Sequence, residues 1–270
     1  MVRYIFLFLI IISAGFGDIL EEKIKSLVDK KSYIQHQKLI EKIFENRNEF
    51  YLDESHVDIV KVVQRLKENG LLKLFFNEPR KLIVTFRTNG YPLFFIKLVS
   101  DKLRELGYYY FLTYEARNED DGFYWSISLT AEYAIDPVIL SNALKKEGCL
   151  ILDIRREDEE RWVYTVDING AYLDVLELEP NVKTKLKKPV SDYWLALPKG
   201  RKISIASMPG NSWYPRVAIY DKRLHLLKVY KKDEKTSWIV LRLPENAYYI
   251  KISDIYTLGN IKNGLKVVLE

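Results

Sequence analysis

An approximate internal repeat in residues 82–168 constrains the fold more than any other feature. Each half has the same predicted order of features: a strand, a proline, a helix, a glycine and a second strand. The four strands expected are Leu82–Thr88, Tyr108–Ala116, Phe123–Tyr133 and Cys149–Arg155. Pro92 and Pro137 suit the first turn of a helix, whereas Gly107 and Gly148 suit a helix end. The order strand-helix-strand-strand-helix-strand predicts a ferredoxin-like unit.

The strand predicted at Phe123–Tyr133 indicates how this sheet is covered. Phe123, Trp125 and Ile127 alternate with Ser126 and Ser128, so one face is apolar and the other mostly polar. This pattern is typical of a sheet with helices on one side only. After the acidic turn at 157–160, apolar residues alternate along one further hairpin strand: Trp162, Tyr164, Val166 and Ile168.

The segment before the repeat is predicted to be helical. We expect helices from Asp18, over about 33–48, and from after Ser55 to Gly70. Asp18 with Glu21 resembles a capping box, and Gly70 is a typical residue after a helix end.

From Gly170 onward the pattern changes to short alternating runs. They are 172–178, 193–197, 202–207, 216–220, 224–230, 237–243, 248–253 and 265–269. Proline, glycine and asparagine turns separate them, which favours a β-sandwich, in particular a jelly roll. The chain is therefore expected to be an α+β protein. Its predicted parts are a signal peptide (1–17), a helical segment (18–80), a ferredoxin-like domain (81–169) and a sandwich domain (170–270).

The first seventeen residues predict export. Arg3 precedes the apolar run Tyr4–Ile12, and small residues around Gly15 and Gly17 precede Asp18. This is the layout of a secretory signal peptide cut after Gly17. The apolar run is too short to cross a hydrocarbon core about 30 Å thick. We expect a periplasmic or secreted protein without stable membrane insertion.

Composition excludes some classes of function. A net charge of +5 with both signs interspersed does not indicate a nucleic-acid-binding protein. Cys149 is the only cysteine, so an intramolecular disulfide is impossible. It opens an apolar run and is interpreted as a core thiol.

The sequence contains no recognisable catalytic motif. His36, His56 and His225 lie near neither a nucleophile elbow nor a glycine-rich phosphate loop. Asp53-Glu54-Ser55-His56-Val57-Asp58 could supply metal ligands, but a helix cap at Ser55 and Asp58 explains it more simply. Asp221 is interpreted as a turn residue. We therefore predict neither cofactor nor metal.

One loop carries the candidate binding residues. Trp213 and Tyr214 stand in the turn-rich segment 208–215. Large aromatic side chains on a loop can stack on sugars or anchor a protein partner. Alternatively, Trp213 folds inward and closes the end of the sandwich core.

The segments SMPGNSWYPRVAIYDKRLHLL and LPENAYYIKISD resemble jelly-roll domains of the carbohydrate-binding type. With the signal peptide and the Ile-, Lys- and Tyr-rich composition, the chain is also similar to a group of periplasmic proteins of flagellated epsilon-class bacteria. Some of that group take part in flagellar motility. The resemblance brings no catalytic motif and implies a non-enzymatic part or accessory of an envelope machine.

Three hypotheses follow. The first is a non-enzymatic periplasmic binding or scaffold protein whose partner is an envelope protein, at the flagellar motor or another machine. Exposed sheet edges suit such assembly. The second is a carbohydrate- or peptidoglycan-binding protein that acts through the sandwich. The third, an envelope hydrolase, lacks an identifiable nucleophile or acid/base pair.

Overall fold

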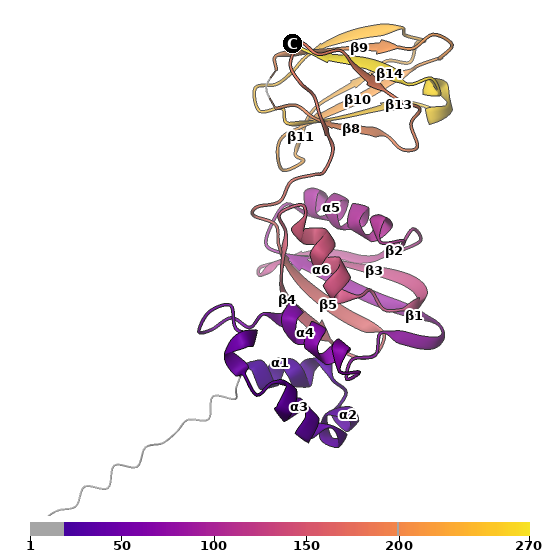
Figure 1. Ribbon diagram of the computed structural model, residues 1–270. Helices are drawn as coiled ribbons and strands as arrows, with labels where there is room; N and C mark the ends of the chain where they lie inside the picture. Colours follow the sequence, from indigo (N-terminus) through magenta and orange to yellow (C-terminus); the bar gives the residue numbers. More distant parts are fainter. Residues whose placement is uncertain (1–18, 199) are drawn as a thin grey trace, which may run out of the picture.

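The computed structural model describes residues 19–198 and 200–270 as a mixed α+β protein. Three parts follow one another along its length: a group of N-terminal helices, a sheet with two helices, and a β-sandwich (Figure 1). The proposed signal peptide and Asp18 lie outside the described residues. None of the described helices has the length and hydrophobicity to cross a bilayer.

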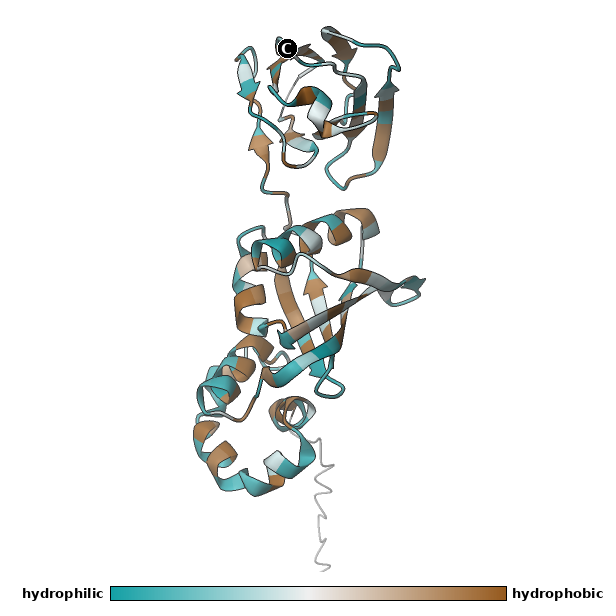
Figure 2. Ribbon diagram, turned by 90° about the vertical axis from the view of Figure 1, so that its right-hand side faces the viewer, coloured by the Kyte–Doolittle hydropathy of each residue, from teal (hydrophilic) through white to brown (hydrophobic). Residues whose placement is uncertain are grey.

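The N-terminal helices are shorter than predicted. They are α1 (Ile19–Leu27), α2 (Lys30–Gln35), α3 (Gln37–Ile43) and α4 (Ile59–Glu68), with a 3-10 turn at Arg47–Phe50. The single helix predicted over 33–48 is wrong, because the backbone leaves helical geometry at His36. Helix α4 starts after Asp58 rather than Ser55, since the Asp58 carboxylate accepts the Lys61 N–H at 3.1 Å. Hydrophobic and hydrophilic residues alternate along these helices, as in amphipathic helices (Figure 2).

The middle part is built on a five-stranded sheet. Its elements are β1 (Phe75–Thr88), α5 (Pro92–Glu105), β2 (Leu112–Glu119), β3 (Gly122–Tyr133), α6 (Pro137–Lys145), β4 (Leu150–Arg156) and β5 (Arg161–Asp167). The strand order is β2-β3-β1-β5-β4, with β1 antiparallel to β3 and parallel to β5. The predicted order of strands and helices and the prolines at both helix starts are confirmed.

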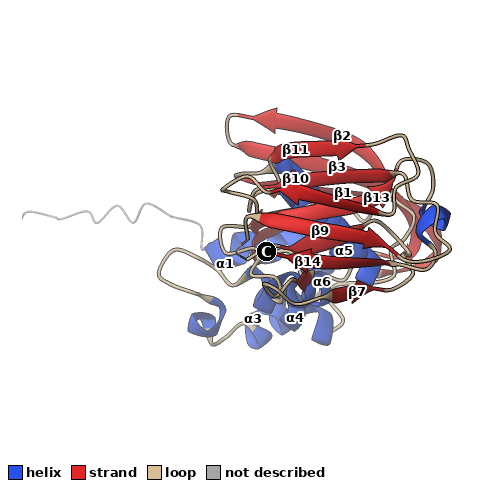
Figure 3. Cartoon of the chain, turned by 90° about the horizontal axis from the view of Figure 1, so that it is seen from above, coloured by secondary structure: helices blue, strands red, loops and turns tan. Residues whose placement is uncertain are grey.

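Helices cover one face of this sheet, as the alternation predicted. Figure 3 shows them gathered on one side of the strands. Phe86, Trp125 and Tyr164 come from three neighbouring strands and are almost fully buried beneath the helices. The Phe86 ring lies 5.9 Å from Trp125 and 5.5 Å from Tyr164. This aromatic row holds the three central strands together.

The added hairpin strand changes the sheet from the predicted ferredoxin-like arrangement. That arrangement places the fourth strand directly beside the first. Here β5 turns back from β4 and enters between β4 and β1. Trp162, Tyr164 and Val166 on β5 are at most 2% exposed. Because a central strand buries large side chains better than an edge strand, the more aromatic strand occupies the inner position.

The C-terminal part is a sandwich of two sheets. Its strands are β6 (Leu176–Glu177), β7 (Thr184–Leu186), β8 (Tyr193–Ala196), β9 (Lys202–Ser207), β10 (Pro215–Tyr220), β11 (Leu226–Lys231), β12 (Trp238–Arg242), β13 (Tyr249–Asp254) and β14 (Leu265–Leu269). One sheet has the order β11-β10-β13-β8-β6 and the other β12-β9-β14-β7. Most of the alternating runs that were predicted to be strands are strands in the structure. The run 172–178 is wrong except for its last residues, because Leu173 bonds instead to the Tyr249 hydroxyl at 3.0 Å. Strand β7 was not predicted.

The sandwich packs against the middle part. Leu224 and Tyr249 are buried with the middle core rather than within the sandwich. The Lys97 ammonium lies 5.2 Å from the centre of the Trp194 ring. On the other side of α5, Lys102 forms a 2.5 Å ion pair with Glu147, and both side chains are at most 6% exposed. This pair ties α5 to the end of α6 beneath the junction.

Cys149 lies in the core, as predicted, and is fully buried. Burial raises the pKa of its thiol to about 12. We expect no reaction with a thiol reagent at pH 8 in the native protein, and one reactive thiol after denaturation, because the thiolate is the reactive form. Rapid labelling of the native protein would contradict a core position.

Candidate functional site

Trp213 occupies the core of the sandwich. Its side chain is 0% exposed, and its Nε1–H donates to the Ser253 carbonyl oxygen at 2.9 Å. A ring in this position cannot stack on a ligand at the surface. The structure therefore selects the second interpretation of this loop, in which Trp213 closes the end of the core, and corrects the expectation of an exposed platform at this residue.

Tyr214 is partly exposed but held within its own loop. Its N–H donates to Asp254 Oδ2 at 2.7 Å, and its ring meets Tyr256 edge-on at 5.1 Å. Asp254 also accepts from the backbone of Tyr256 and Thr257 and from Asn260. The loop owes its shape to this buried carboxylate, and Tyr214 alone offers only a small contact surface.

The contacts of His56 do not have the geometry of a catalytic triad. Ser55 Oγ and both Asp53 carboxylate oxygens approach the same nitrogen of His56, Nδ1, at 2.8–3.1 Å. A catalytic triad needs the serine and the acid on opposite ring nitrogens. His225 Nδ1 lies 2.7 Å from Asp221 at an exposed hairpin end. No cluster of metal-ligating side chains occurs in residues 19–270 as far as the structure describes them.

A run of exposed apolar residues lies at the entrance to β2. We call it the tyrosine edge: Tyr109, Tyr110, Leu112 and Tyr114, which are 66, 93, 77 and 63% exposed. Between them Phe111 turns inward and meets Trp125 edge-on at 6.1 Å. Phe111 thus anchors the segment while its neighbours face solvent. Contiguous exposed apolar residues of this kind mark interaction surfaces.

Strand β2 is an edge of the middle sheet. It pairs with β3 on one side, and the described residues contribute no strand on the other. Its later half carries Glu115, Arg117 and Glu119, joined by ion pairs. Charged residues protect an edge from indiscriminate strand pairing. The apolar half near Leu112 lacks this protection, and a register shift at Tyr114 separates the two halves.

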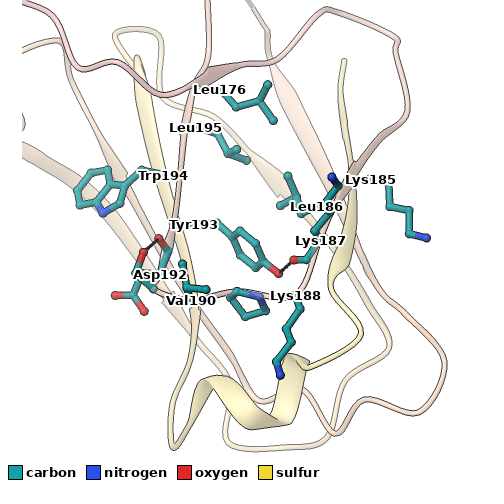
Figure 4. Close-up of a pocket in the computed structure, with 12 residues that line it drawn as sticks. Leu176, Lys185, Leu186, Lys187, Lys188, Val190, Asp192, Tyr193, Trp194 and Leu195 are labelled. Carbon is teal, nitrogen blue, oxygen red and sulfur yellow. Dashed lines mark hydrogen bonds between the residues drawn. The ribbon is translucent and has the colours of Figure 1, made fainter. Parts of the chain in front are cut away.

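A second candidate surface is a groove in the sandwich beside β7 and β8. We call it the lysine groove. It has a volume of about 440 Å³ and is lined mainly by residues 185–195. Figure 4 shows Tyr193 crossing it toward the Lys187 carbonyl, to which the Tyr193 hydroxyl donates, with Lys185 and Lys188 at the rim. Burial raises the pKa of Tyr193 to about 12, so the phenol stays neutral.

The charge of this groove is positive. Three lining residues, Lys185, Lys187 and Lys188, are exposed and form no ion pair within the described part of the chain. The acidic lining residue, Asp192, is neutralised by Lys251 at 2.7 Å. The groove therefore suits an anionic ligand.

Each of the two surfaces corresponds to a recognisable run of residues in the sequence. Two residues of the tyrosine edge, Tyr109 and Tyr110, belong to a run of three tyrosines that begins at Tyr108 and was predicted only to be part of a strand. Three lysines of the groove, Lys185, Lys187 and Lys188, belong to a lysine-rich run at 183–188. Neither run resembles a catalytic or metal-binding motif. A binding surface depends on which residue types are exposed together, and it does not require them at a fixed spacing in the sequence.

Comparison with known proteins assigns no family. No protein-family model matches the chain, and no curated protein does so at a significant level. The structure resembles a complex of accessory secretory proteins 1, 2 and 3 of Streptococcus pneumoniae, with 12% identity and a TM-score of 0.20. That match covers 38% of this chain and 90% of the other.

Two further matches are equally slight. The glycosylation-associated Gap123 complex of Streptococcus agalactiae has 15% identity and a TM-score of 0.20, and the match covers 36% of this chain and 35% of the other. The C-terminal domain of EclA, a sugar-binding protein, has 11% identity and a TM-score of 0.16, over 36% and 68% of the two chains. Similarity at this level assigns neither fold nor function.

We predict that Trp213→Ala lowers the free energy of unfolding by about 3 kcal/mol or more, because it empties a buried aromatic site. Tyr214→Ala should cost only about 1 kcal/mol, since the loss is one edge-on ring contact. Urea denaturation of both variants measures the difference. Equal small effects would place Trp213 outside the core.

Proposed function

We propose that the protein is a non-enzymatic binding or scaffold protein of the cell envelope, which docks a protein partner at the tyrosine edge. The observation that carries this proposal is the exposure of three tyrosines and Leu112 beside an unpaired strand edge. Tyrosine is enriched at protein interfaces because it combines a large apolar ring with a hydroxyl group. The edge of β2 adds backbone groups that a partner's strand can pair with.

The rest of the middle part supports a rigid docking surface. Phe111 fixes the segment on the core, and the aromatic row beneath β1 fixes the sheet. A preorganised surface loses little conformational entropy on binding. The charged half of β2 restricts pairing to a partner that matches the apolar half.

The place of action is proposed to be the periplasm, on the strength of the export segment. The envelope machine that it would serve is proposed to be the flagellar motor, as the resemblance to periplasmic proteins of epsilon-class bacteria implies. A deletion strain that loses swimming while its wall composition stays normal would support a partner there. Normal swimming would direct the search to another envelope assembly.

We predict that a photo-crosslinking amino acid at position 110 captures a discrete partner in cells, whereas the same group at position 226 does not. Leu226 is a matched control, because it is also exposed on an edge strand, β11. A self-adduct would identify the partner as a second copy. No adduct from position 110 or 114 would contradict the proposal.

Once the partner is identified, its affinity for variants of the protein can be measured. Tyr110→Ser combined with Leu112→Ser should weaken binding of the partner by about 2 kcal/mol or more, roughly 30-fold. Leu226→Ser combined with Val229→Ser serves as the control and should leave the affinity unchanged. Both pairs are exposed, so the melting temperatures should stay close to that of the unaltered protein. Unchanged binding by the first pair would overturn the docking surface.

The lysine groove favours a second candidate function, the binding of an anionic envelope polymer through the sandwich. Peptidoglycan carries free carboxylates that unpaired lysines can contact. A jelly-roll sandwich of carbohydrate-binding type, as the resemblance implies, is compatible with this role. The Tyr193 ring supplies an apolar surface between the charges.

We predict that Lys187→Glu with Lys188→Glu reduces sedimentation with purified peptidoglycan about tenfold, as expected for two reversed surface contacts. Lys228→Glu with Lys231→Glu, which makes the same charge change on β11, should have little effect. Binding should also weaken as salt is added. Equal losses in both double variants would show attraction by net charge alone.

A further inference from the structure

The outer face of the sandwich sheet β12-β9-β14-β7 carries the most exposed tryptophan of the protein, Trp238. On β12 the buried residues Ile239 and Leu241 point into the sandwich core. Trp238 and Arg242 alternate with them and therefore point outward. The sandwich meets the middle part through its other sheet, which contains Tyr249, so this face lies on the far side (Figure 1).

The indole ring of Trp238 is not used within the protein. It is 60% exposed, and within the described residues it forms no hydrogen bond, aromatic contact or cation contact. Three of the other four tryptophans are at most 2% exposed, and Trp194 stacks on Tyr220 at 5.3 Å. Of the five tryptophans, all of which the structure describes, Trp238 is therefore the one whose ring is free to contact a ligand.

The register of the sheet places two lysines in the same row as Trp238. Trp238 pairs with Ala206 on β9. Ala206 in turn pairs with Lys266 on β14, and Lys266 pairs with Lys185 on β7. Ala206 has only a methyl group, so it leaves the neighbouring indole uncovered. Three strand spacings, about 14 Å in all, separate the backbones of Trp238 and Lys185, which is longer than a single sugar ring.

Most cations of this face have no acidic partner. Lys185, Lys266 and Arg242 form no ion pair within the part of the chain that the structure describes. Lys202 is neutralised by Glu270 at 2.7 Å. The face therefore offers three unpaired positive charges around one exposed aromatic ring, and it attracts an anionic ligand.

We propose that this face binds an anionic polysaccharide, with a sugar ring on Trp238 and acidic groups of the neighbouring sugars at Lys266, Lys185 and Arg242. The proposal rests on the second candidate function, the binding of an anionic envelope polymer, and names the surface that contacts the sugar chain. The C–H face of a sugar packs on an aromatic ring, while its carboxylates pair with lysine and arginine. Lys185 also lines the lysine groove, so one polymer chain can reach both surfaces.

A protein partner and a lipid bilayer fit this face less well. Protein interfaces are depleted in lysine, whereas Lys185, Lys202 and Lys266 all stand on the outward side of these strands. Binding to a bilayer scales with the apolar area that is buried. Trp238 and the 37% exposed Val240 provide little such area.

Calorimetric titration of the purified protein tests this face with four ligands: oligosaccharides of alginate, oligosaccharides of hyaluronan, soluble peptidoglycan fragments and neutral dextran oligosaccharides. At least one acidic glycan should bind, and dextran should not. Trp238→Ala should weaken the binding about tenfold, because the stacked ring is lost. Trp238→Tyr keeps a ring and should cost about threefold or less. Lys266→Glu combined with Arg242→Glu should weaken the binding about tenfold or more.

Leu226→Ala is the matched control, because it shortens a side chain of similar exposure, 55%, on the other sheet. It should leave the affinity unchanged. Trp238 makes no side-chain hydrogen bond or ring contact in the described part of the chain, so its variants should keep the melting temperature of the unaltered protein.

Four results would overturn the proposal. None of the acidic glycans binds, dextran binds as well as they do, or Trp238→Ala binds as tightly as the unaltered protein. The last of these, together with a loss of binding in Lys187→Glu with Lys188→Glu, would confine the site to the lysine groove and leave the second candidate function intact. The fourth result is sedimentation with anionic lipid vesicles that depends on Trp238 and is not competed by the glycans. None of these outcomes bears on the partner at the tyrosine edge.

Discussion

The burial of one face of strand β1 is the constraint on which the rest of the structure depends. β1 is the middle strand of the five, and its inward residues Leu82, Val84 and Phe86 are at most 1% exposed. These residues can be covered only when strands lie on both sides and α5 and α6 lie above. The neighbouring strands, the position of both helices and the open opposite face all follow from this burial.

The same requirement explains where the exposed surfaces occur. β5 takes the inner position because its aromatic side chains need cover on both sides, which leaves β4 and β2 as the edges. β4 is partly shielded, since α1 reaches it through the Lys23–Asp153 ion pair at 2.5 Å. β2 has no such cover in the described part of the chain. The tyrosine edge is therefore the surface that the packing of this sheet leaves open.

The junction with the sandwich combines apolar and ionic contacts. Leu224 and Tyr249 extend the middle core, while Arg223 bonds to backbone carbonyls at the end of β5. Beneath them the Lys102–Glu147 pair is buried, and removing one partner of such a pair leaves an uncompensated charge.

The sequence by itself determined the order and type of most elements, because hydrophobic periodicity, prolines and glycines act locally. Pro92, Pro137 and Gly148 marked helix ends correctly, and Cys149 was correctly assigned to the core. Only the tertiary structure decided which strands lie side by side and which side chains are buried. Strand β5 lies between β1 and β4 because its large side chains, Trp162 and Tyr164, are covered better in an inner strand than at an edge. Trp213 lies inside the sandwich because its exposure depends on the facing sheet, which lies far from it in the sequence.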